Sequence, residues 1–358
     1  MKSHFRPAID ALAGYTPGEQ PKMKQLVKLN TNENPYPPSP RIAEALQAFA
    51  LENLHRYPDP TADALRDDIA ARNAVKRENV ICGNGSDDLL TMIFRAFTDP
   101  ARPVAVLDPS YSLYPVLAAM QEAPVIRMPL DPATFELTGP LAELAKGANL
   151  VMLTRPNAPT GNSLPREEVE RFCAGFGGVV AIDEAYADFA DDNCMEFAAK
   201  YDNVLVLRTF SKSYSLAGLR LGYAVGSSVL IDGLMKLKDS YNVDMLTQVI
   251  GRAAFNDTAT LAVHTTAVRK TRSRLTTELE KLGYTVIPSQ SNFIFASPAD
   301  GDGERVFAEL RRHAVIVRHF PGKVTGRFVR ITVGTDAETD RLLEVLRENF
   351  AEARKHGN

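Results

Sequence analysis

The chain of 358 residues has no tryptophan, only three cysteines and no excess of charge of either sign. Its 41 Lys and Arg nearly balance 44 Asp and Glu, so nothing favours a nucleic-acid partner. No apolar run approaches the roughly 20 residues that span a bilayer, so no membrane partner is expected. The first ten residues mix Lys2, Arg6 and Asp10 and do not form a signal peptide.

The cysteines are too few and too scattered for a disulfide framework or a metal site. Cys82, Cys173 and Cys194 are odd in number and lack metal-ligand spacing. We therefore expect buried thiols, no bound metal and a reducing, cytoplasmic location.

What the chain does contain is an alternation of short apolar runs and helical stretches. Runs rich in Val, Ile and Leu are typical of strands buried on both faces, and their alternation with helices predicts an α/β fold with a mostly parallel sheet. The runs are Pro103–Leu107, Leu150–Leu153, Val179–Ile182, Val204–Leu207 and Leu221–Val225. The helical stretches include Leu89–Phe97, Leu141–Lys146 and Glu167–Phe176.

The pattern changes at both ends of this region. Residues 14–40 are rich in Pro, Gly and Asn, which predicts an extended arm. After residue 245 a long helix, Leu246–Leu282, precedes shorter elements that indicate a smaller α+β domain ending in the helix Asp336–Lys355. We predict an arm at residues 1–29 that packs with the small domain, a large domain at 30–245 and a small domain at 246–358.

Polar residues follow several of the predicted strands, where open α/β sheets bind ligands. Ser86 and Asp87 follow Val80–Cys82 and two glycines, which suits either an anion site or an ordinary capped helix. Asp183 ends an apolar strand, where a carboxylate needs a partner, although it could simply begin a helix. Taken alone, the prolines around Asn157 are better explained by a tight turn than by a binding site.

Two cationic residues stand in unusual surroundings. Lys212 lies between Ser211 and Ser213 directly after a buried strand, with Arg220 eight residues later, which favours an anion pocket containing an amine over a solvated lysine. Arg330 lies within an apolar strand and requires an acidic partner, from either the protein or a substrate. An amine, a buried acid, a phenol and an anion cradle are together the groups that pyridoxal phosphate (PLP) chemistry requires.

With these residues in place, the sequence resembles the fold-type I PLP-dependent aminotransferases, and within them the histidinol-phosphate aminotransferase branch. The resemblance runs from Pro7 to Leu346 and implies a PLP-dependent transferase fold with helices on both faces of the central sheet. It rests on Leu29–Pro35, Arg56–Pro60, Gly83–Asp88, Asn157–Gly161, Asp183–Tyr186, Thr209–Ser213, Ala217–Arg220, Ser289–Phe293 and Val329–Thr335.

The resemblance implies a role for each matching residue. Lys212 would hold the cofactor covalently and move the substrate proton, Asp183 would pair with the ring nitrogen, and Tyr186 would donate to the ring oxygen. The other cofactor contacts would come from Ser86, Asp87, Tyr111, Asn157, Ser211, Arg220 and, from the second subunit of a homodimer with shared active sites, Tyr57. The substrate residues would be Arg330 at the α-carboxylate, with Asn32 nearby, and Arg318 and Tyr15 at the remainder.

The sequence departs from this family at one position. Ala158 stands where an asparagine usually precedes Pro-Thr-Gly, and Asn157 comes one place earlier. Either Asn157 substitutes from a shifted loop, or Tyr186 alone contacts the ring oxygen.

The implied reaction is transfer of the amino group of histidinol phosphate to 2-oxoglutarate in histidine biosynthesis. The alternatives are an aromatic or broad-specificity aminotransferase and an enzyme similar to threonine-phosphate decarboxylase, since both would use the same core. A PLP-sensing transcription regulator is not expected, because the motifs begin at Leu29 and leave too little chain for a DNA-binding domain before them.

Overall fold

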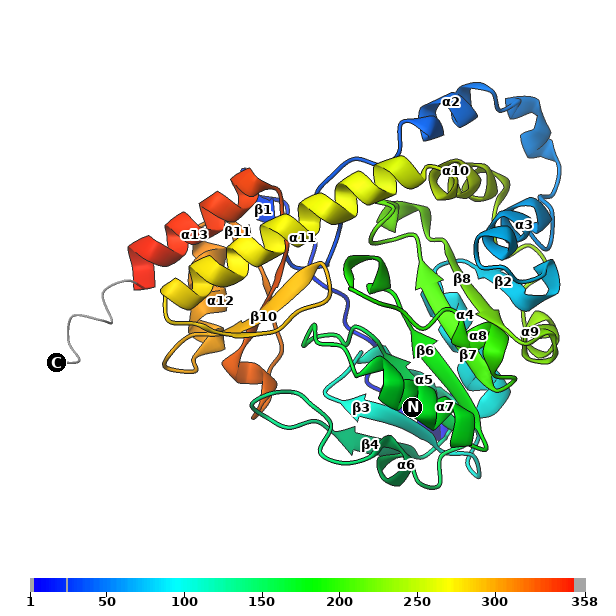
Figure 1. Ribbon diagram of the computed structural model, residues 1–358, viewed down its shortest axis with the longest axis horizontal. Helices are drawn as coiled ribbons and strands as arrows, with labels where there is room; N and C mark the ends of the chain where they lie inside the picture. The colour runs from blue at the N-terminus through cyan, green and yellow to red at the C-terminus, as the bar shows by residue number, and fades with distance from the viewer. Residues whose placement is uncertain (1–2, 24, 351–358) are drawn as a thin grey trace.

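The computed structural model describes residues 3–23 and 25–350 and is built around a seven-stranded sheet (Figure 1). The strand order is β2-β8-β7-β6-β5-β3-β4; β8 runs antiparallel to its two neighbours, and the other pairs are parallel. The predicted, mostly parallel α/β sheet is thus confirmed. The strands are β2 (Val80–Gly83), β3 (Val104–Asp108), β4 (Val125–Pro129), β5 (Leu150–Thr154), β6 (Val179–Asp183), β7 (Val204–Thr209) and β8 (Gly222–Gly226).

Edge strand β4 was not predicted from the sequence. Its Arg127 and Pro129 are exposed, so it lacks the continuous apolar run that marks the inner strands.

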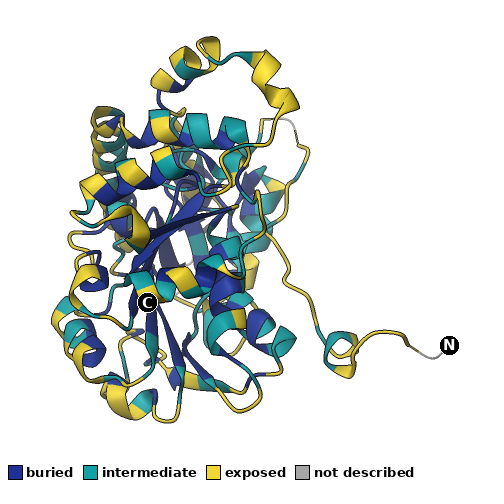
Figure 2. Cartoon of the chain, turned by 90° about the vertical axis from the view of Figure 1, so that its right-hand side faces the viewer, coloured by how far each residue is buried: buried dark blue, intermediate teal, exposed yellow. Residues whose placement is uncertain are grey.

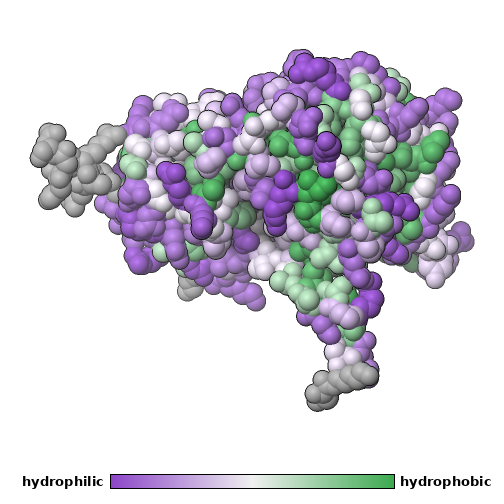
Figure 3. Space-filling model, turned by 90° about the horizontal axis from the view of Figure 1, so that it is seen from below, coloured by the Kyte–Doolittle hydropathy of each residue, from purple (hydrophilic) through white to green (hydrophobic). Residues whose placement is uncertain are grey.

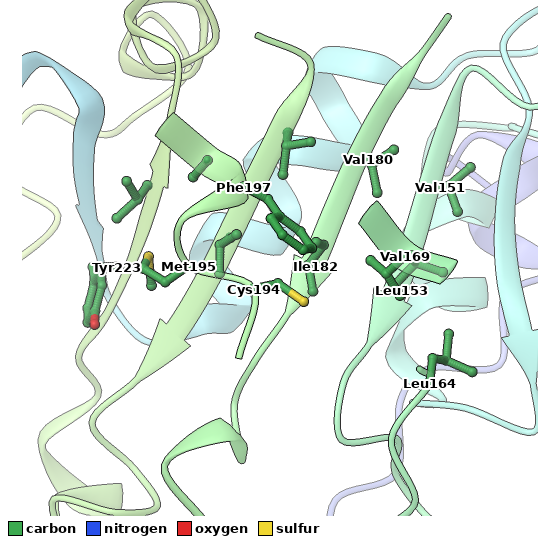
Figure 4. Packing of buried hydrophobic residues seen from close by; sticks show 14 of the residues in the cluster. Val151, Leu153, Leu164, Val169, Val180, Ile182, Cys194, Met195, Phe197 and Tyr223 are labelled. Atoms are coloured by element: carbon green, nitrogen blue, oxygen red, sulfur yellow. The ribbon is translucent and has the colours of Figure 1, made fainter. Parts of the chain in front are cut away.

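Successive residues of the inner strands enter separate hydrophobic clusters on the two faces of the sheet, as the period of two requires. On β6, Val180 and Ile182 join one cluster, whereas Ala181 joins the other. In Figure 4, Phe197 and Cys194 lie over Ile182 on the first face. Helices α3, α7, α8 and α10 contribute to that cluster, and α4, α5 and α9 cover the opposite face, so the strands lie buried in the middle of the molecule (Figure 2).

The helices of the chain, including short 3-10 turns labelled η, have the following bounds. They are α1 (Pro7–Asp10), α2 (Arg41–Gln47), η1 (Leu51–His55), α3 (Asp63–Arg72), η2 (Arg77–Asn79), α4 (Ser86–Phe97), α5 (Leu113–Met120), α6 (Leu141–Leu144), α7 (Arg166–Gly175), η3 (Ala187–Phe189), α8 (Phe197–Lys200), η4 (Ala217–Leu219), α9 (Ser228–Met235), α10 (Met245–Phe255), α11 (Thr258–Lys281), α12 (Gly303–Arg312), η5 (Thr325–Arg327) and α13 (Asp336–Phe350). Among the described residues, no helix combines the length and apolarity that a membrane crossing requires.

The prediction of one helix over Leu246–Leu282 is wrong. The chain breaks between α10 and α11, where the Asp257 carboxylate accepts a hydrogen bond from the Thr260 N–H and caps the second helix. Helix α10 packs on α2 and α3, and its Phe255 belongs to the core of the large sheet.

A second, antiparallel sheet follows α11 and has the order β12-β13-β10-β9. Its strands are β9 (Thr285–Ile287), β10 (Phe293–Ser297), β12 (Arg318–His319) and β13 (Val329–Thr332). With α11, α12 and α13 it encloses a separate apolar cluster that includes Leu279, Ile294 and Leu342. The predicted continuation of the last helix to Lys355 lies outside the described residues.

The N-terminal segment crosses between these two parts. β1 (Val27–Lys28) pairs in parallel with β11 (Val315–Ile316), and Leu29 is buried in the cluster of the second sheet. Farther toward the N-terminus the segment stands out from the body of the molecule (Figure 3), and Arg6 contacts Glu122 and the Met120 carbonyl at the end of α5. The boundaries at residues 29 and 245 stay predictions.

Candidate functional site

A cavity of about 270 Å³ opens where the parallel strands end, and β12, β13 and the N-terminal segment close its other side. Loops after β2, β3, β5, β6 and β7 reach it, because parallel strands bring their carboxyl ends to one edge of the sheet. The predicted site residues in its wall are Tyr15, Asn32, Ser86, Asp87, Tyr111, Asp183, Tyr186, Ser211, Lys212, Arg220, Arg318 and Arg330. Asn157 and Tyr57 lie outside this wall.

Asp183, the last residue of β6, is only 4% exposed. Its Oδ2 accepts a hydrogen bond of 2.8 Å from the Tyr114 hydroxyl, and its Oδ1 accepts one of 3.2 Å from the Ala185 N–H. Burial raises the pKa of this carboxyl to about 6, although Tyr114 opposes the shift. The site thus contains a costly buried acid that faces no cation of the protein at hydrogen-bond distance among the described residues.

Lys212 follows β7 and carries a weakly held proton. Its Nζ donates to the Thr31 carbonyl at 3.1 Å. Burial, followed by repulsion from Arg330, lowers the pKa of Lys212 to about 8. An amine with such a pKa is partly neutral at physiological pH and can act as a nucleophile or a base.

The start of α4 and the loop after β7 form a cradle. Arg220 places one guanidinium nitrogen 3.1 Å from Asp87 Oδ2 and another 3.4 Å from Ser211 Oγ. A Cβ on Gly85, which has φ +80°, would lie 2.6 Å from Arg220, so only glycine admits the arginine so close to the helix N-terminus. Backbone N–H groups, two hydroxyls and a guanidinium suit an anion such as a phosphate.

Tyr111 and Tyr186 reach the cavity from the loops after β3 and β6. The Tyr186 hydroxyl accepts a hydrogen bond of 2.9 Å from Asn32 Nδ2, an amide that reaches it from the N-terminal segment. Burial raises the pKa of Tyr186. Tyr111 packs edge-on against Tyr15 at 5.8 Å between ring centroids, so the N-terminal segment also helps to enclose the cavity.

Two arginines project from the second sheet. Arg318 and Arg330 are direct partners in the antiparallel register of β12 and β13, so their side chains share one face. Within the described residues neither forms a salt bridge; Arg330 donates to the Asn30 carbonyl at 2.9 Å, and its buried Nε has no hydrogen-bond partner. The sequence left open whether the acidic partner of Arg330 comes from the protein or from a substrate. Since no described residue supplies one, a substrate anion is the partner that remains.

The Asn157 side chain is fully engaged inside its own loop. Its Nδ2 donates to the Pro109 carbonyl and to Thr160 Oγ1, and its Oδ1 accepts from Ser110. Ala158, not Asn157, lines the cavity, so the geometry does not support a cofactor contact for Asn157. Tyr57 is the other predicted site residue that lies outside the cavity wall. It is 76% exposed and stacks on Tyr241 with 4.4 Å between ring centroids.

Sequence reasoning missed several cavity residues. Thr154, Gln20 and Phe320 line the cavity, and Phe320 lies under the guanidinium groups of Arg318 and Arg330. Tyr114 does not line the cavity but is buried behind it, where it contacts Asp183. Only the three-residue spacing from Tyr111 hinted at Tyr114; nothing in the pattern marked the others. The described residues contain no cluster of His, Cys, Asp and Glu suited to a metal ion.

Comparison with known proteins agrees with this architecture. The family model for aminotransferase class I and II matches residues 24–346. The chain is 43% identical to histidinol-phosphate aminotransferase 1 of Bordetella parapertussis, over 98% of this chain and 100% of that protein. It is 45% identical to histidinol-phosphate aminotransferase 2 of Thiobacillus denitrificans, over 96% and 97%.

Solved structures are similar over the same extent. The crystal structure of histidinol-phosphate aminotransferase from Sinorhizobium meliloti in complex with pyridoxal-5'-phosphate aligns with a TM-score of 0.87 and 26% identity, and covers 97% of this chain and 99% of that one. Sequence and structure therefore agree that this chain belongs to the class I and II aminotransferases.

Proposed function

We propose that this enzyme binds PLP and transfers the amino group of histidinol phosphate to 2-oxoglutarate. The observation that carries the substrate assignment is the Arg318–Arg330 pair, two cations on one face of the cavity without an acidic partner among the described residues. Side-by-side guanidinium groups are stabilised by an anion that both can reach, and a phosphate ester presents more charge and more acceptor oxygens than a carboxylate.

The cavity fits PLP at each of its polar ends. Lys212 would hold the aldehyde carbon, Asp183 the ring nitrogen, and Tyr186 the ring oxygen. Ser86, Asp87 through its backbone, Ser211 and Arg220 would hold the phosphate in the cradle already described. Tyr111 would stack on the ring, while the Asn32 amide fixes the Tyr186 hydroxyl.

PLP, when bound, withdraws electrons from the substrate Cα and so acidifies its proton. Asp183 keeps the ring nitrogen protonated by pairing a buried carboxylate with it, an interaction that strengthens where water is excluded. Lys212 Nζ, with its lowered pKa, takes the proton from Cα and returns it on the cofactor side. The two arginines orient the substrate so that the Cα–H bond is the one that breaks.

The substrate assignment is tested by comparing kcat/KM for histidinol phosphate, phenylalanine and tyrosine, each with 2-oxoglutarate. We expect histidinol phosphate to be preferred. A preference for phenylalanine would reject the phosphate assignment, and product analysis that shows loss of CO2 from a phosphorylated amino acid would instead support the decarboxylase alternative.

We further propose a cytoplasmic homodimer in which Tyr57 reaches the cofactor phosphate of the second subunit. The support is its exposure on the surface, away from its own cavity, while its ring is held against Tyr241. Hybrid dimers test this arrangement. One subunit would carry Lys212→Ala and the other Tyr57→Ala; a shared site leaves one intact active site per hybrid, whereas an unshared site leaves none.

A further inference from the structure

A row of hydroxyl groups leads away from the Asp183 carboxyl. Tyr114 Oη lies 2.8 Å from Asp183 Oδ2 and 2.8 Å from Thr154 Oγ1. Ser110 Oγ lies 3.1 Å from Thr154 Oγ1 and 2.9 Å from Asn157 Oδ1. We refer to Tyr114, Thr154 and Ser110 as the hydroxyl chain. It joins α5, the end of β5 and the loop before α5 to the acid at the end of β6.

The far end of the hydroxyl chain, Asn157 Oδ1, can only accept a hydrogen bond. Asn157 Nδ2 donates to the Pro109 carbonyl at 3.0 Å and to Thr160 Oγ1 at 2.8 Å. A backbone carbonyl cannot donate, so this contact fixes the orientation of the amide. Asn157 Oδ1 therefore faces Ser110 as an acceptor.

Beside an ionised Asp183, the hydroxyl chain has one proton too few for its hydrogen bonds. The three hydroxyls bring one proton each, but four oxygen–oxygen contacts separate Asp183 from Asn157. If Asp183 is a carboxylate, both ends are acceptors, and one contact must set lone pair against lone pair. If Asp183 carries a proton, its O–H donates to Tyr114 Oη, the reverse of the donation that an ionised Asp183 receives from Tyr114, and each of the four contacts then holds one proton.

We propose that the hydroxyl chain is a positioning device that keeps a proton on Asp183 until PLP binds, so that the apoenzyme supplies the proton for the ring nitrogen. Tyr114 and Thr154 are 0% and 2% exposed, so water can reach the hydroxyl chain only from the cavity side, at the partly buried Ser110 and the edge of Thr154, and cannot replace a hydrogen bond at Tyr114. The proposal also gives Asn157 a role that its position outside the cavity wall leaves open.

The other groups around Asp183 act in both directions: burial raises the pKa of its carboxyl, whereas the hydrogen bond from the Ala185 N–H lowers it. The titratable groups nearest the carboxyl are Asp87 of α4, Tyr114 of α5, and Glu184 and Tyr186 after β6. Burial, together with repulsion from Asp87 and Glu184, raises the pKa of Asp183 to about 6. Changes confined to Thr154 leave all of these groups in place.

On PLP binding, the O–H bond of Asp183 would break and leave its electron pair on the carboxylate, and the lone pair of the ring nitrogen would form the new N–H bond. The resulting ion pair replaces the hydrogen bond that the chain loses when Asp183 ionises. This inference rests on the proposed pairing of Asp183 with PLP, which cofactor binding tests separately.

Thr154→Val separates the two protonation states of Asp183. Valine keeps the shape of threonine but lacks the hydroxyl that joins Tyr114 to Ser110. Tyr114 can then donate to an ionised Asp183 without leaving two oxygen lone pairs in contact farther along the hydroxyl chain. A protonated Asp183 then leaves the Tyr114 proton without an acceptor. We expect the titration midpoint of Asp183 in the full-length apoenzyme to fall by about one pH unit, the shift that one or two lost hydrogen bonds would produce.

Infrared difference spectra across pH measure that midpoint from the C=O stretch of the protonated carboxyl, assigned by its absence in Asp183→Asn. Thr154→Ser is the matched control, because it keeps the hydroxyl, and its midpoint should equal that of the wild type. An unchanged or raised midpoint in Thr154→Val would overturn the proposal. If Thr154→Val does not fold, Ser110→Ala also removes the conflict and should lower the midpoint.

Calorimetry of PLP binding in two buffers of different ionisation enthalpy counts the protons taken from solution. At a pH between the Asp183 midpoints of wild type and Thr154→Val, the wild-type apoenzyme already holds a proton on Asp183. On binding PLP it should therefore take up several tenths of a proton fewer from solution than Thr154→Val does. Equal uptake would reject proton delivery by Asp183. Absence of PLP binding to wild-type protein would instead reject the proposed function.

Discussion

The two sheets contribute to one cavity in different ways. The parallel sheet offers loops at its strand ends, which bring an amine, an acid and an anion cradle together from segments far apart in sequence. The antiparallel sheet offers side chains from the face of paired strands, and places Arg318 opposite Arg330. The first arrangement suits fixed chemistry around a cofactor, and the second suits substrate selection, because a substitution on a strand face alters one contact without moving a loop.

The largest expected effect lies on the parallel sheet. Lys212→Ala should lower kcat by about 10³-fold or more, because it removes both the covalent attachment and the general base. Borohydride reduction followed by mass spectrometry should find the cofactor attached to wild-type protein and absent from the variant. Normal turnover by Lys212→Ala would break the assignment of chemistry to this sheet.

On the antiparallel sheet, Arg330→Ala should reduce kcat/KM about 100-fold for every amino donor, since charge-assisted hydrogen bonds contribute about 1.5–3 kcal/mol each. PLP affinity, measured by equilibrium dialysis, should change little. A loss of PLP binding comparable to the loss of activity would contradict the assignment of cofactor binding to the parallel sheet and of substrate binding to the antiparallel sheet.

Asp183→Asn should change stability with pH in the apoenzyme. The pKa of Asp183 is raised in the folded state, so the folded protein holds this proton more tightly, and wild-type stability falls as pH rises from about 4 through about 6. Asparagine does not titrate. As the pH rises from about 4 through about 6, the free energy of unfolding of the variant should therefore increase by ~1–3 kcal/mol relative to that of the wild type, as measured by chemical denaturation of both apoenzymes. A pH-independent difference would contradict this prediction.

The smallest expected effect is that of Arg318, and it should distinguish the role of this arginine from that of Arg330 on the same sheet. Arg318→Gln should lower kcat/KM about 10-fold for histidinol phosphate but much less for phenylalanine, because one charged contact to a phosphate is worth roughly 1.4 kcal/mol more than its neutral replacement. The ratio of the two kcat/KM values gives the answer. An equal fall for both substrates would remove Arg318 from phosphate recognition.

Secondary structure followed the sequence where the apolar pattern was strong. The inner strands β5, β6 and β7 appear within a residue or two of their predicted bounds, because a strand buried on both faces must be continuously apolar. Edge strand β4 and the break at Asp257 went undetected, since exposure on one side and a single capping contact leave little trace in periodicity.

By itself, the sequence determined the strands of the parallel sheet and the kinds of polar residue in the loops that follow them. Both follow from local requirements, namely the burial of each strand and the residues that each turn needs. Only the tertiary structure decided which side chains meet. It set Arg318 against Arg330, brought Asn32 to Tyr186, and connected Asp183 through hydroxyls to Asn157. These contacts join residues between 12 and 154 positions apart, and the direction of a single side chain decides whether each one forms.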